Sequence, residues 1–352
     1  MSDTKKVAVA MSGGVDSSAA ALLVLGAGWS ATGATMRLLP GQEADIADAK
    51  GICDRLEISH TVYDLSNEFK QHVIEPFIAM YESGGTPNPC ILCNRFMKFG
   101  ALLDAALSDG HDALATGHYA RIEQDGSGRY LLKTARDPQK DQSYFLWQLT
   151  QHQLSHILLP LGGYTKADIR EIAEANSLIT AHKSDSQDIC FVPDGDYAAF
   201  IERYMGRVCP PGTFVDESGC VLGPNKGVIH YTIGQRKGLG IALGQPMFVK
   251  SKNAVTGQVV LSTNDRLFFR ELTVEGLNLI VADRLDGDIR ATVKIRYRHD
   301  ACPATIRQLD EHHARVIFDE PQRAAADGQS AVFYDGDTVI GGGFIMAPDA
   351  AV

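Results

Sequence analysis

The stretch that most constrains the fold of this chain is AMSGGVDSS at residues 10–18. The run before it, KKVAVAM at 5–11, has the continuous apolar character of a buried parallel strand. The run after it, DSSAAALLVL at 16–25, is rich in helix-forming residues. The two glycines therefore stand where a strand turns into a helix, so the chain begins with a βα unit.

The glycine-rich turn has the properties of a pyrophosphate-binding loop. Gly13 and Gly14 let the backbone approach an anion, and the first helical N–H groups and the helix dipole favour negative charge. The turn has neither the Gly-Lys-Ser/Thr of a Walker loop nor a G-x-G-x-x-G fingerprint. Its SGG-x-DS pattern resembles the PP-loop of ATP pyrophosphatases, which adenylate a substrate oxygen and release pyrophosphate. The alternative is an ordinary βα turn in which Asp16 caps the helix.

The composition fits a globular protein of two or three domains, with 352 residues, 45% hydrophobic and 22% charged. The net charge is −10, so an RNA site has to be a local basic patch. The sequence shows no secretion signal and no run of about 18 apolar residues, so we expect a cytoplasmic protein without a membrane partner. Seven cysteines in such a chain indicate metal binding or thiol chemistry rather than a disulfide framework.

Strand and helix patterns alternate after the loop. Strands are predicted at 30–39 and 60–65, and helices at 45–56 and from residue 66 onward. This alternation predicts an α/β fold with a doubly wound parallel sheet, whose ligands bind at the carboxyl ends of the strands. Met36, near the end of the second strand, would lie either against a bound adenine or in the ordinary core.

One cysteine follows a segment rich in proline and glycine. The segment SGGTPNPCIL at 83–92 is predicted to be irregular because those residues break helices and strands. A helix is predicted from Asn94, which would place Cys93 beside a helix N-terminus. There the dipole and Arg95 or Lys98 would lower the thiol pKa, and a thiolate would be a competent nucleophile.

A second cysteine of interest, Cys190, lies between the polar run HKSDSQD at 182–188 and an apolar anchor, a position that suits a thiol that must move. The spacing Cys90-x-x-Cys93 also permits a zinc knuckle. A zinc ribbon needs two such knuckles, and the chain has no second one. The spacing alone does not show whether Cys93 and Cys190 meet over a nucleotide site.

Two polar groups follow the next strand. The strand predicted at 112–116 ends in Gly117-His118, so His118 is a candidate ligand contact, with a hydrogen-bonded structural histidine as the alternative. A hairpin is predicted over 119–135. The cluster Lys140-Asp141-Gln142 precedes an apolar stretch, and by itself it is typical of a solvated helix start.

Near residue 205 the pattern changes from helices to short alternating strands with Gly and Asn turns. We therefore divide the chain into a catalytic domain at 1–205, a small central β-rich domain at 206–275 and a C-terminal β domain at 276–352.

The C-terminal β domain contains a basic stripe. Lys294, Arg296 and Arg298 alternate with apolar residues, which predicts three cations on one strand face. Such a stripe is either a phosphate-backbone contact or a salt-bridged solvent face.

Motifs spread over nearly the whole chain resemble those of the bacterial tRNA-specific 2-thiouridylases. They are SGGVDSS (12–18), NPCILCN (88–94), ATGHYAR (115–121), KDQSYFL (140–146), ICF (189–191), HYTIGQRKGLGI (230–241) and KIRYR (294–298). Many PP-loop enzymes share the first motif, but its combination with the two cysteine motifs is specific. The resemblance implies a PP-loop domain of the adenine nucleotide alpha hydrolase type, a small central domain and a C-terminal β-barrel that helps to hold tRNA.

The resemblance also implies the ligands and their contacts. ATP, consumed as a substrate together with Mg²⁺, would contact Ala10, Met11, Ser12, Gly13, Gly14, Val15, Asp16, Ser17, Met36 and Gly117. The wobble uridine of certain tRNAs is the target, and Asn88, Pro89 and Cys90 would line the flipped-out base. The other residues that match tRNA-contact positions are His118, Lys140, Asp141, Gln142, Arg296, Tyr297 and Gln329. No protein residue is assigned as a metal ligand.

The implied mechanism starts with adenylation, which turns the uridine C2 oxygen into a good leaving group. Cys190 would carry a persulfide received from a sulfur-relay protein or a cysteine desulfurase. Cys93 would free the sulfur by forming a disulfide with Cys190, or assist direct attack by the persulfide. The products would be 2-thiouridine, AMP and pyrophosphate.

One position departs from the family pattern, since Cys90 stands where the family commonly has Asp. A thiol titrates near 8.5 and a carboxyl near 4, so Cys90 cannot simply replace that group. Either the carboxylate is not essential, or Cys90 works as a thiolate or as another disulfide partner of Cys93. Two rival functions stay open at this point. They are a PP-loop synthetase acting on a small molecule and a non-catalytic, zinc-stabilised RNA-binding protein.

Overall fold

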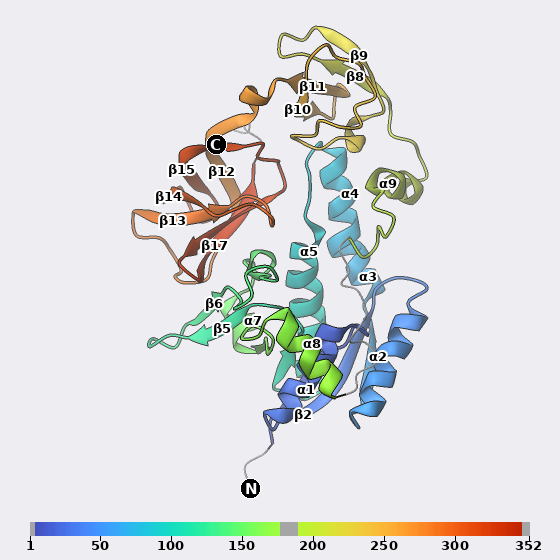
Figure 1. Cartoon of the computed structure of the whole chain (residues 1–352), viewed down its shortest axis with the longest axis vertical. Coiled ribbons are helices and arrows are strands. Elements are labelled where there is room, and N and C mark those ends of the chain that lie inside the picture. Colours follow the sequence, from blue (N-terminus) through green and yellow to red (C-terminus); the bar gives the residue numbers. More distant parts are fainter. Residues whose placement is uncertain (1–3, 177–188, 347–352) are drawn as a thin grey trace.

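The computed structural model describes residues 4–176 and 189–346, which form three lobes (Figure 1). An α/β lobe holds the N-terminal part of the chain, and a small β lobe lies at the opposite end of the longest axis. A β-barrel lies to one side of the helices that run between these two lobes. The polar run at 182–188 lies outside the described residues. Within the described part, no helix is long and apolar enough to cross a membrane.

The α/β lobe is built on a parallel sheet in the strand order β3-β2-β1-β4-β7, which confirms the predicted fold class. Val7, Ala8 and Val9 have no exposed surface, as the uninterrupted apolar run predicts. The strands are β1 (Lys6–Ala10), β2 (Ser30–Arg37), β3 (His60–Asp64), β4 (Ala113–Ala115) and β7 (Ile157–Leu158). The helices are α1 (Val15–Gly26), α2 (Glu43–Arg55), α3 (Ser66–Phe69), η1 (Lys70–Ile74), α4 (Glu75–Glu82), α5 (Pro89–Leu92), η2 (Cys93–Leu102), α6 (Leu103–Ser108), η3 (Ser143–Phe145), α7 (Gln151–Ser155), α8 (Lys166–Ala175) and α9 (Tyr197–Met205).

The order of the strands reverses at β1, which pairs with β2 on one side and with β4 on the other. In open parallel sheets, ligands bind in the crevice beyond the carboxyl ends of the strands at such a reversal. The glycine-rich loop follows β1, and Gly117 follows β4. Two motifs about a hundred residues apart in the sequence therefore meet at one crevice.

The helix predicted from Asn94 begins earlier, at Pro89, and α5, η2 and α6 follow one another without a break to Ser108. Asn88 is its N-cap, and its side-chain oxygen accepts a hydrogen bond from the backbone N–H of Cys90 at 3.3 Å. Proline suits the first position of a helix because the N–H that it lacks has no partner there. The irregular segment predicted through residue 92 is therefore wrong for 89–92, and Cys93 lies in the second helical turn instead of beside the N-terminus.

The small lobe and the barrel are made mainly of strands, as predicted, but β12 with 12 residues and β15 with 10 residues are not short. The small lobe pairs its strands in the order β10-β11-β8-β9, and the barrel in the order β12-β15-β14-β13-β16-β17, closed by pairing of β12 with β17. Because β12 is one continuous strand of this barrel, we place the start of the barrel unit at Phe268 instead of at 276. The bounds are β8 (Gly212–Val215), β9 (Val221–Asn225), η5 (Val228–His230), β10 (Phe248–Asn253), β11 (Gln258–Ser262), η6 (Asn264–Leu267), β12 (Phe268–Leu279), β13 (Asp288–Lys294), β14 (Cys302–Gln308), β15 (Ala314–Arg323), β16 (Ser330–Asp335) and β17 (Thr338–Ile345).

The predicted stripe of three cations on one strand is wrong. Strand β13 ends at Lys294, so Arg296 and Arg298 lie in the bend and turn that follow. The Arg296 guanidinium points inward and donates to the carbonyl oxygens of Ile233 at 3.3 Å and Ala324 at 2.6 Å. Apolar and basic residues continue to alternate after Lys294, but the backbone is no longer extended there. The three cations therefore do not share one strand face.

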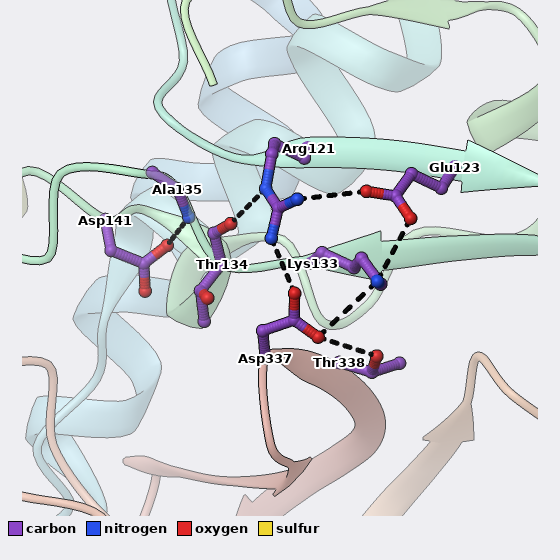
Figure 2. Close-up of polar contacts among 8 residues, drawn as sticks. All are labelled: Arg121, Glu123, Lys133, Thr134, Ala135, Asp141, Asp337 and Thr338. Carbon is purple, nitrogen blue, oxygen red and sulfur yellow. Dashed lines mark hydrogen bonds and ion pairs between the residues drawn. The ribbon is translucent and has the colours of Figure 1, made fainter. Parts of the chain in front are cut away.

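The predicted hairpin at 119–135 is present as β5 (Arg121–Gln124) and β6 (Tyr130–Lys133), and it extends the sheet of the barrel through pairing of Lys133 with Thr338. Figure 2 shows Asp337 between two cations of the hairpin. Its oxygens lie 2.6 Å from Arg121 Nη2 and 3.5 Å from Lys133 Nζ. These groups are partly exposed and screened by water, so the two ion pairs add little to stability and mainly fix how the lobes are oriented.

The segment that follows the hairpin is also docked on the barrel. Trp147 is fully buried, and its Nε1 donates to Ser330 Oγ at 3.1 Å. The Tyr144 hydroxyl donates to the carbonyl oxygen of Ser330 at 2.9 Å. The apolar part of the KDQSYFL motif therefore joins the α/β lobe to the barrel.

We predict that Trp147→Phe destabilises the protein. The change removes the indole N–H and leaves the buried Ser330 hydroxyl without its donor, at a cost of about 1–3 kcal/mol. The measurement is the midpoint of urea unfolding followed by circular dichroism. Trp29→Phe is the matched control, because Trp29 is half-buried at the periphery of the other lobe. Equal midpoints for the two variants would contradict the prediction.

Candidate active site

The glycine-rich loop curls around the start of α1. The Ser17 hydroxyl donates to the carbonyl oxygen of Gly14 at 3.0 Å and lies 3.3 Å from the Ser12 hydroxyl. Gly14 is the N-cap residue of α1 and has no side chain with which to satisfy the first helical N–H groups. These donors and the positive end of the helix dipole favour an anion at the loop.

Asp16 does not cap α1, because it lies inside the first turn. Its carboxylate instead accepts hydrogen bonds from Lys166 Nζ, at 2.8 and 2.9 Å, and from the Tyr119 hydroxyl at 2.9 Å. The alternative reading of the loop as an ordinary turn capped by Asp16 is therefore wrong. The loop is held by an ion pair with a distant helix.

Lys166 is a residue of this site that sequence reasoning missed. Its side chain is only 8% exposed, and it lies in the first turn of α8, where the helix dipole disfavours a cation. The ion pair with Asp16 offsets that cost. A capping box of Thr165 and Asp168 opens α8 and places Lys166 in the first turn. No sequence pattern shows that this turn packs against the phosphate loop.

Gly117 has to be a glycine because the end of β4 presses against the start of α1. A Cβ atom at this position would lie 2.7 Å from the carbonyl carbon of Asp16 and 2.9 Å from the backbone nitrogen of Ser17. Real Cβ atoms do not approach backbone so closely. The structure thus brings the predicted ATP-contact residues 12–17 and 117 together.

Met36 is partly buried and packs against the large apolar cluster that runs through the lobes. This packing agrees with the core reading of the residue. Its contact with adenine stays a prediction.

The structure brings three thiols close enough to affect one another. The pKa of Cys93 is raised to about 12, mainly by burial and to a smaller extent by Cys190 and Cys90, while Lys98 opposes the shift. Burial also raises the pKa of Cys190, as does Cys90, and Lys98 again opposes the shift. The predicted lowering of the Cys93 pKa is wrong in this conformation, because the thiol lies in the second helical turn and is shielded from water.

Cys190 lies next to an apolar anchor, as the sequence predicts. Cys190 is exposed, and the next residue, Phe191, is buried between the rings of Phe69 and Phe77, with centroid distances of 5.7 and 5.1 Å. An exposed thiol therefore stands beside a fixed aromatic anchor. Among the described residues, no group of three or more His, Cys, Asp or Glu side chains could hold a metal ion, so the zinc reading gains no support.

His118 is a buried histidine that links the two parts of the site. Its Nδ1 lies 2.8 Å from Thr116 Oγ1, and its Nε2 lies 3.4 Å from Lys98 Nζ. Burial and Lys98 lower its pKa well below the usual value, so the ring is neutral at physiological pH. Because Lys98 can only donate, Nε2 accepts and Nδ1–H donates to Thr116. In this conformation His118 is therefore a hydrogen-bonded structural histidine. Its contact with tRNA stays a prediction.

Asp141 and Gln142 hold backbone in place. The buried Asp141 carboxylate accepts from the N–H of Ala135 at 2.9 Å and from the Ser143 hydroxyl at 2.8 Å (Figure 2 shows the first contact). Gln142 Oε1 accepts from the N–H of Tyr119 at 2.9 Å. Asp141 and Gln142 are therefore not part of a solvated helix start. The contacts of Lys140, Asp141 and Gln142 with tRNA stay predictions.

The remaining predicted tRNA contacts lie where lobes meet. Tyr297 of the barrel packs on Phe145, with ring centroids 4.5 Å apart. Gln329 Nε2 donates to the carbonyl oxygen of Thr86 at 2.7 Å. That loop leads directly to Asn88, Pro89 and Cys90 at the start of α5.

We predict that Gly117→Ala weakens ATP binding by roughly tenfold or more, because the new methyl group would displace the start of α1 and distort the anion-binding donors. Calorimetric titration with ATP measures the effect. Gly126→Ala in the exposed hairpin turn is the control, since a Cβ atom there meets nothing within 4 Å. Equal ATP affinity in both variants would contradict this view of Gly117.

Comparison with known families covers the chain in three parts. The model described as the tRNA methyl transferase HUP domain matches residues 5–194. The tRNA methyl transferase PRC-barrel domain matches residues 198–263, and the aminomethyltransferase beta-barrel domain matches residues 269–345. The three matches coincide with the α/β lobe, the small β lobe and the barrel.

Full-length relatives are similar over nearly the whole chain. A tRNA-specific 2-thiouridylase MnmA from Acetivibrio thermocellus is 47% identical over 97% of this chain and 99% of its own length. The protein of the same name from Treponema denticola is 47% identical over 97% of each chain, and that from Lachnoclostridium phytofermentans is 45% identical over 97% of this chain and 99% of its own length. The chain therefore belongs to the tRNA-specific 2-thiouridylase family.

Proposed function

We propose that this protein converts a wobble uridine of tRNA into 2-thiouridine, using ATP to activate the base and a cysteine persulfide as the sulfur source. The observation that carries the proposal is the pair Gly117-His118. Gly117 packs on the phosphate loop, and His118 contacts Lys98, the cation that lowers the pKa of all three thiols. One dipeptide therefore joins an anion-binding half-site to a sulfur half-site.

In the first step, the uridine C2 oxygen attacks the α-phosphorus of ATP. The bond between the α- and β-phosphates breaks, and the electron pair leaves with pyrophosphate. The loop of residues 12–17 is suited to hold that pyrophosphate, because its N–H groups and hydroxyls are donors at a helix N-terminus. The product is a C2–O–AMP group, from which AMP can leave.

Mg²⁺ fits this site as a companion of ATP. The ion prefers oxygen ligands and is usually bound through one or two carboxylates and the substrate phosphates. Asp16 supplies one carboxylate at the loop, and Asp45 and Asp48 lie beside Gly13. Asp16 would contact the ion, whose charge would neutralise the phosphates.

In the second step, the terminal sulfur of a Cys190 persulfide attacks C2, and AMP leaves with the former C2 oxygen. The Cys93 thiolate then attacks Cys190 Sγ, so that the sulfur bound to C2 leaves with the electron pair as 2-thiouridine and a Cys93–Cys190 disulfide forms. In the alternative order, Cys93 attacks the persulfide first and releases hydrosulfide, which attacks C2. A cellular thiol reductant restores the pair after either route.

The raised pKa of Cys93 gives Lys98 a role in this chemistry. With a pKa of about 12, only on the order of 0.01% of the thiol is ionised at pH 8. Lys98 opposes this shift for Cys93, and for Cys190 it does so together with hydrogen bonds from backbone N–H groups. We therefore assign Lys98 to thiolate stabilisation during sulfur transfer.

The proposed partners follow from the chemistry. The substrate is tRNA, and the persulfide comes from a sulfur-relay protein or a cysteine desulfurase that reaches the exposed Cys190. We expect the reaction to take place in the cytoplasm, where these partners and ATP are present.

Cys90 is a passive residue, a thiolate or a disulfide partner of Cys93. Comparing the yield of 2-thiouridine from Cys90→Asp with that from Cys90→Ala distinguishes these roles.

We predict that Cys93→Ser and Cys190→Ser each abolish 2-thiouridine formation while tRNA binding persists, because each change removes a sulfur that the second step uses. The measurements are mass analysis of tRNA nucleosides and a filter-binding assay. Cys220→Ser, at an exposed cysteine of the small β lobe, is the control. A fully active Cys93 or Cys190 variant would overturn the assignment. Release of pyrophosphate with a small molecule in place of tRNA would favour the rival synthetase.

We predict that Lys166→Met slows tRNA-dependent pyrophosphate release by roughly 100-fold, because Asp16 loses its ion-pair partner at the loop. Lys166→Arg should recover part of the rate. The control is Lys50→Met, which removes an exposed ion pair with Asp54 on α2. A Lys166→Met rate equal to that of the control would show that the ion pair is dispensable.

A further inference from the structure

Lys252 of β10 occupies a junction between all three lobes. Its Nζ donates to the carbonyl oxygen of Tyr231 in the small lobe at 2.8 Å and to that of Gly85 in the α/β lobe at 3.2 Å. The ammonium group also lies 5.9 Å from the ring centroid of Tyr81. Burial lowers its pKa to about 8, and Asp327 of the barrel opposes the shift. This lysine is thus a largely dehydrated cation that bonds to backbone on both sides of a lobe boundary.

The barrel holds the same loop from another side. The N–H of Thr86 donates to the carbonyl oxygen of Asp327 at 2.8 Å, and Gln329 Nε2 donates to the carbonyl oxygen of Thr86 at 2.7 Å. Gly85 is packed so closely that a Cβ atom would lie 2.4 Å from Met80 Sδ and 3.2 Å from the Asp327 oxygen. Residues 85 and 86 of the α/β lobe are therefore fixed by the Lys252 side chain of the small lobe and by the Gln329 side chain and the Asp327 carbonyl group of the barrel.

The sequence that follows this loop is stiff. It reads Thr86-Pro87-Asn88-Pro89, and then Cys90 in the first turn of α5. Each proline has a fixed φ angle, and the residue before each proline is restricted to extended conformations. Few backbone rotations are therefore left between Thr86 and Cys90 to absorb a shift of Thr86, so much of that shift is passed on to Cys90.

We propose that Lys252 is a positioning residue for the target base. Together with Gln329 it fixes residues 85 and 86, and through the two prolines it sets the place of Asn88, Pro89 and Cys90, which are proposed to contact the uridine. The inference rests on that proposed contact. It makes the small β lobe, which lies away from the phosphate loop, a determinant of how the base is presented for adenylation.

The test compares Lys252→Met with Lys250→Met. Lys250 lies two positions earlier on the same strand and forms an exposed ion pair with Glu217. We expect Lys252→Met to lower kcat for 2-thiouridine formation by roughly 10- to 100-fold, the range caused by a misplacement near 1 Å, with ATP affinity unchanged. Lys252→Arg should recover part of the rate because it keeps a positive charge and donors. Lys250→Met should behave as wild type.

A second readout follows the loop itself and does not depend on the reaction. We expect the rate at which iodoacetamide alkylates Cys90, measured by mass spectrometry relative to Cys220, to change by about threefold or more in Lys252→Met. Gln329→Ala, which removes the other side-chain anchor, should change it too. The control for Gln329 is Gln124→Ala, whose amide donates to the Gly128 carbonyl oxygen in the exposed hairpin turn.

The inference is overturned if Cys90 alkylation is unchanged in both Lys252→Met and Gln329→Ala, or if Lys252→Met forms 2-thiouridine at the wild-type rate. If Lys252→Met does not fold, alkylation in Gln329→Ala decides. If the wild-type protein forms no 2-thiouridine, the proposed function fails while the alkylation comparison still tests whether Lys252 positions the loop.

Discussion

The contact on which the candidate site depends is the approach of the end of β4 to the start of α1. It exists because β1 and β4 are neighbours in a parallel sheet, so their carboxyl ends share one edge. At that edge Gly117 leaves room for α1, and His118 turns away toward Lys98. A side chain larger than hydrogen at residue 117 would separate the anion-binding half-site from the sulfur half-site, which we propose act on one carbonyl group of the uridine.

The lobes are joined by shared secondary structure as well as by side chains. The hairpin of β5 and β6 comes from the α/β lobe but extends the sheet of the barrel, and Trp147 follows it into the barrel contact. Lys252 ties the small lobe to the loop before α5. Each lobe thus reaches the candidate site through a segment that another lobe holds, which limits how far the lobes can move independently.

Local sequence patterns predict most of the regular elements, and long-range packing explains the failures. The apolar run of β1 and the glycine-rich turn are enough to identify the parallel sheet and the phosphate loop. Proline breaks helices in general but is favoured at a first helical position, as at Pro89, so the predicted place of Cys93 is wrong. Lys166 has no signal in the sequence, since its partner Asp16 is 150 residues away. The Arg296 side chain bonds inward to carbonyls of distant segments, which residue alternation does not encode.

The shared hairpin also has a consequence for synthesis on the ribosome. Lys133 of β6 pairs with Thr338 of β17, so the hairpin is made long before its partner strand. With about 200 residues between them and about 5–20 residues added per second, its edge waits roughly 10–40 s without that partner. An unpaired edge invites association with other nascent chains, and charged side chains discourage it. Arg121, Glu123 and Lys133, which pair with one another in the finished fold and whose two cations also pair with Asp337, are charged side chains of this kind.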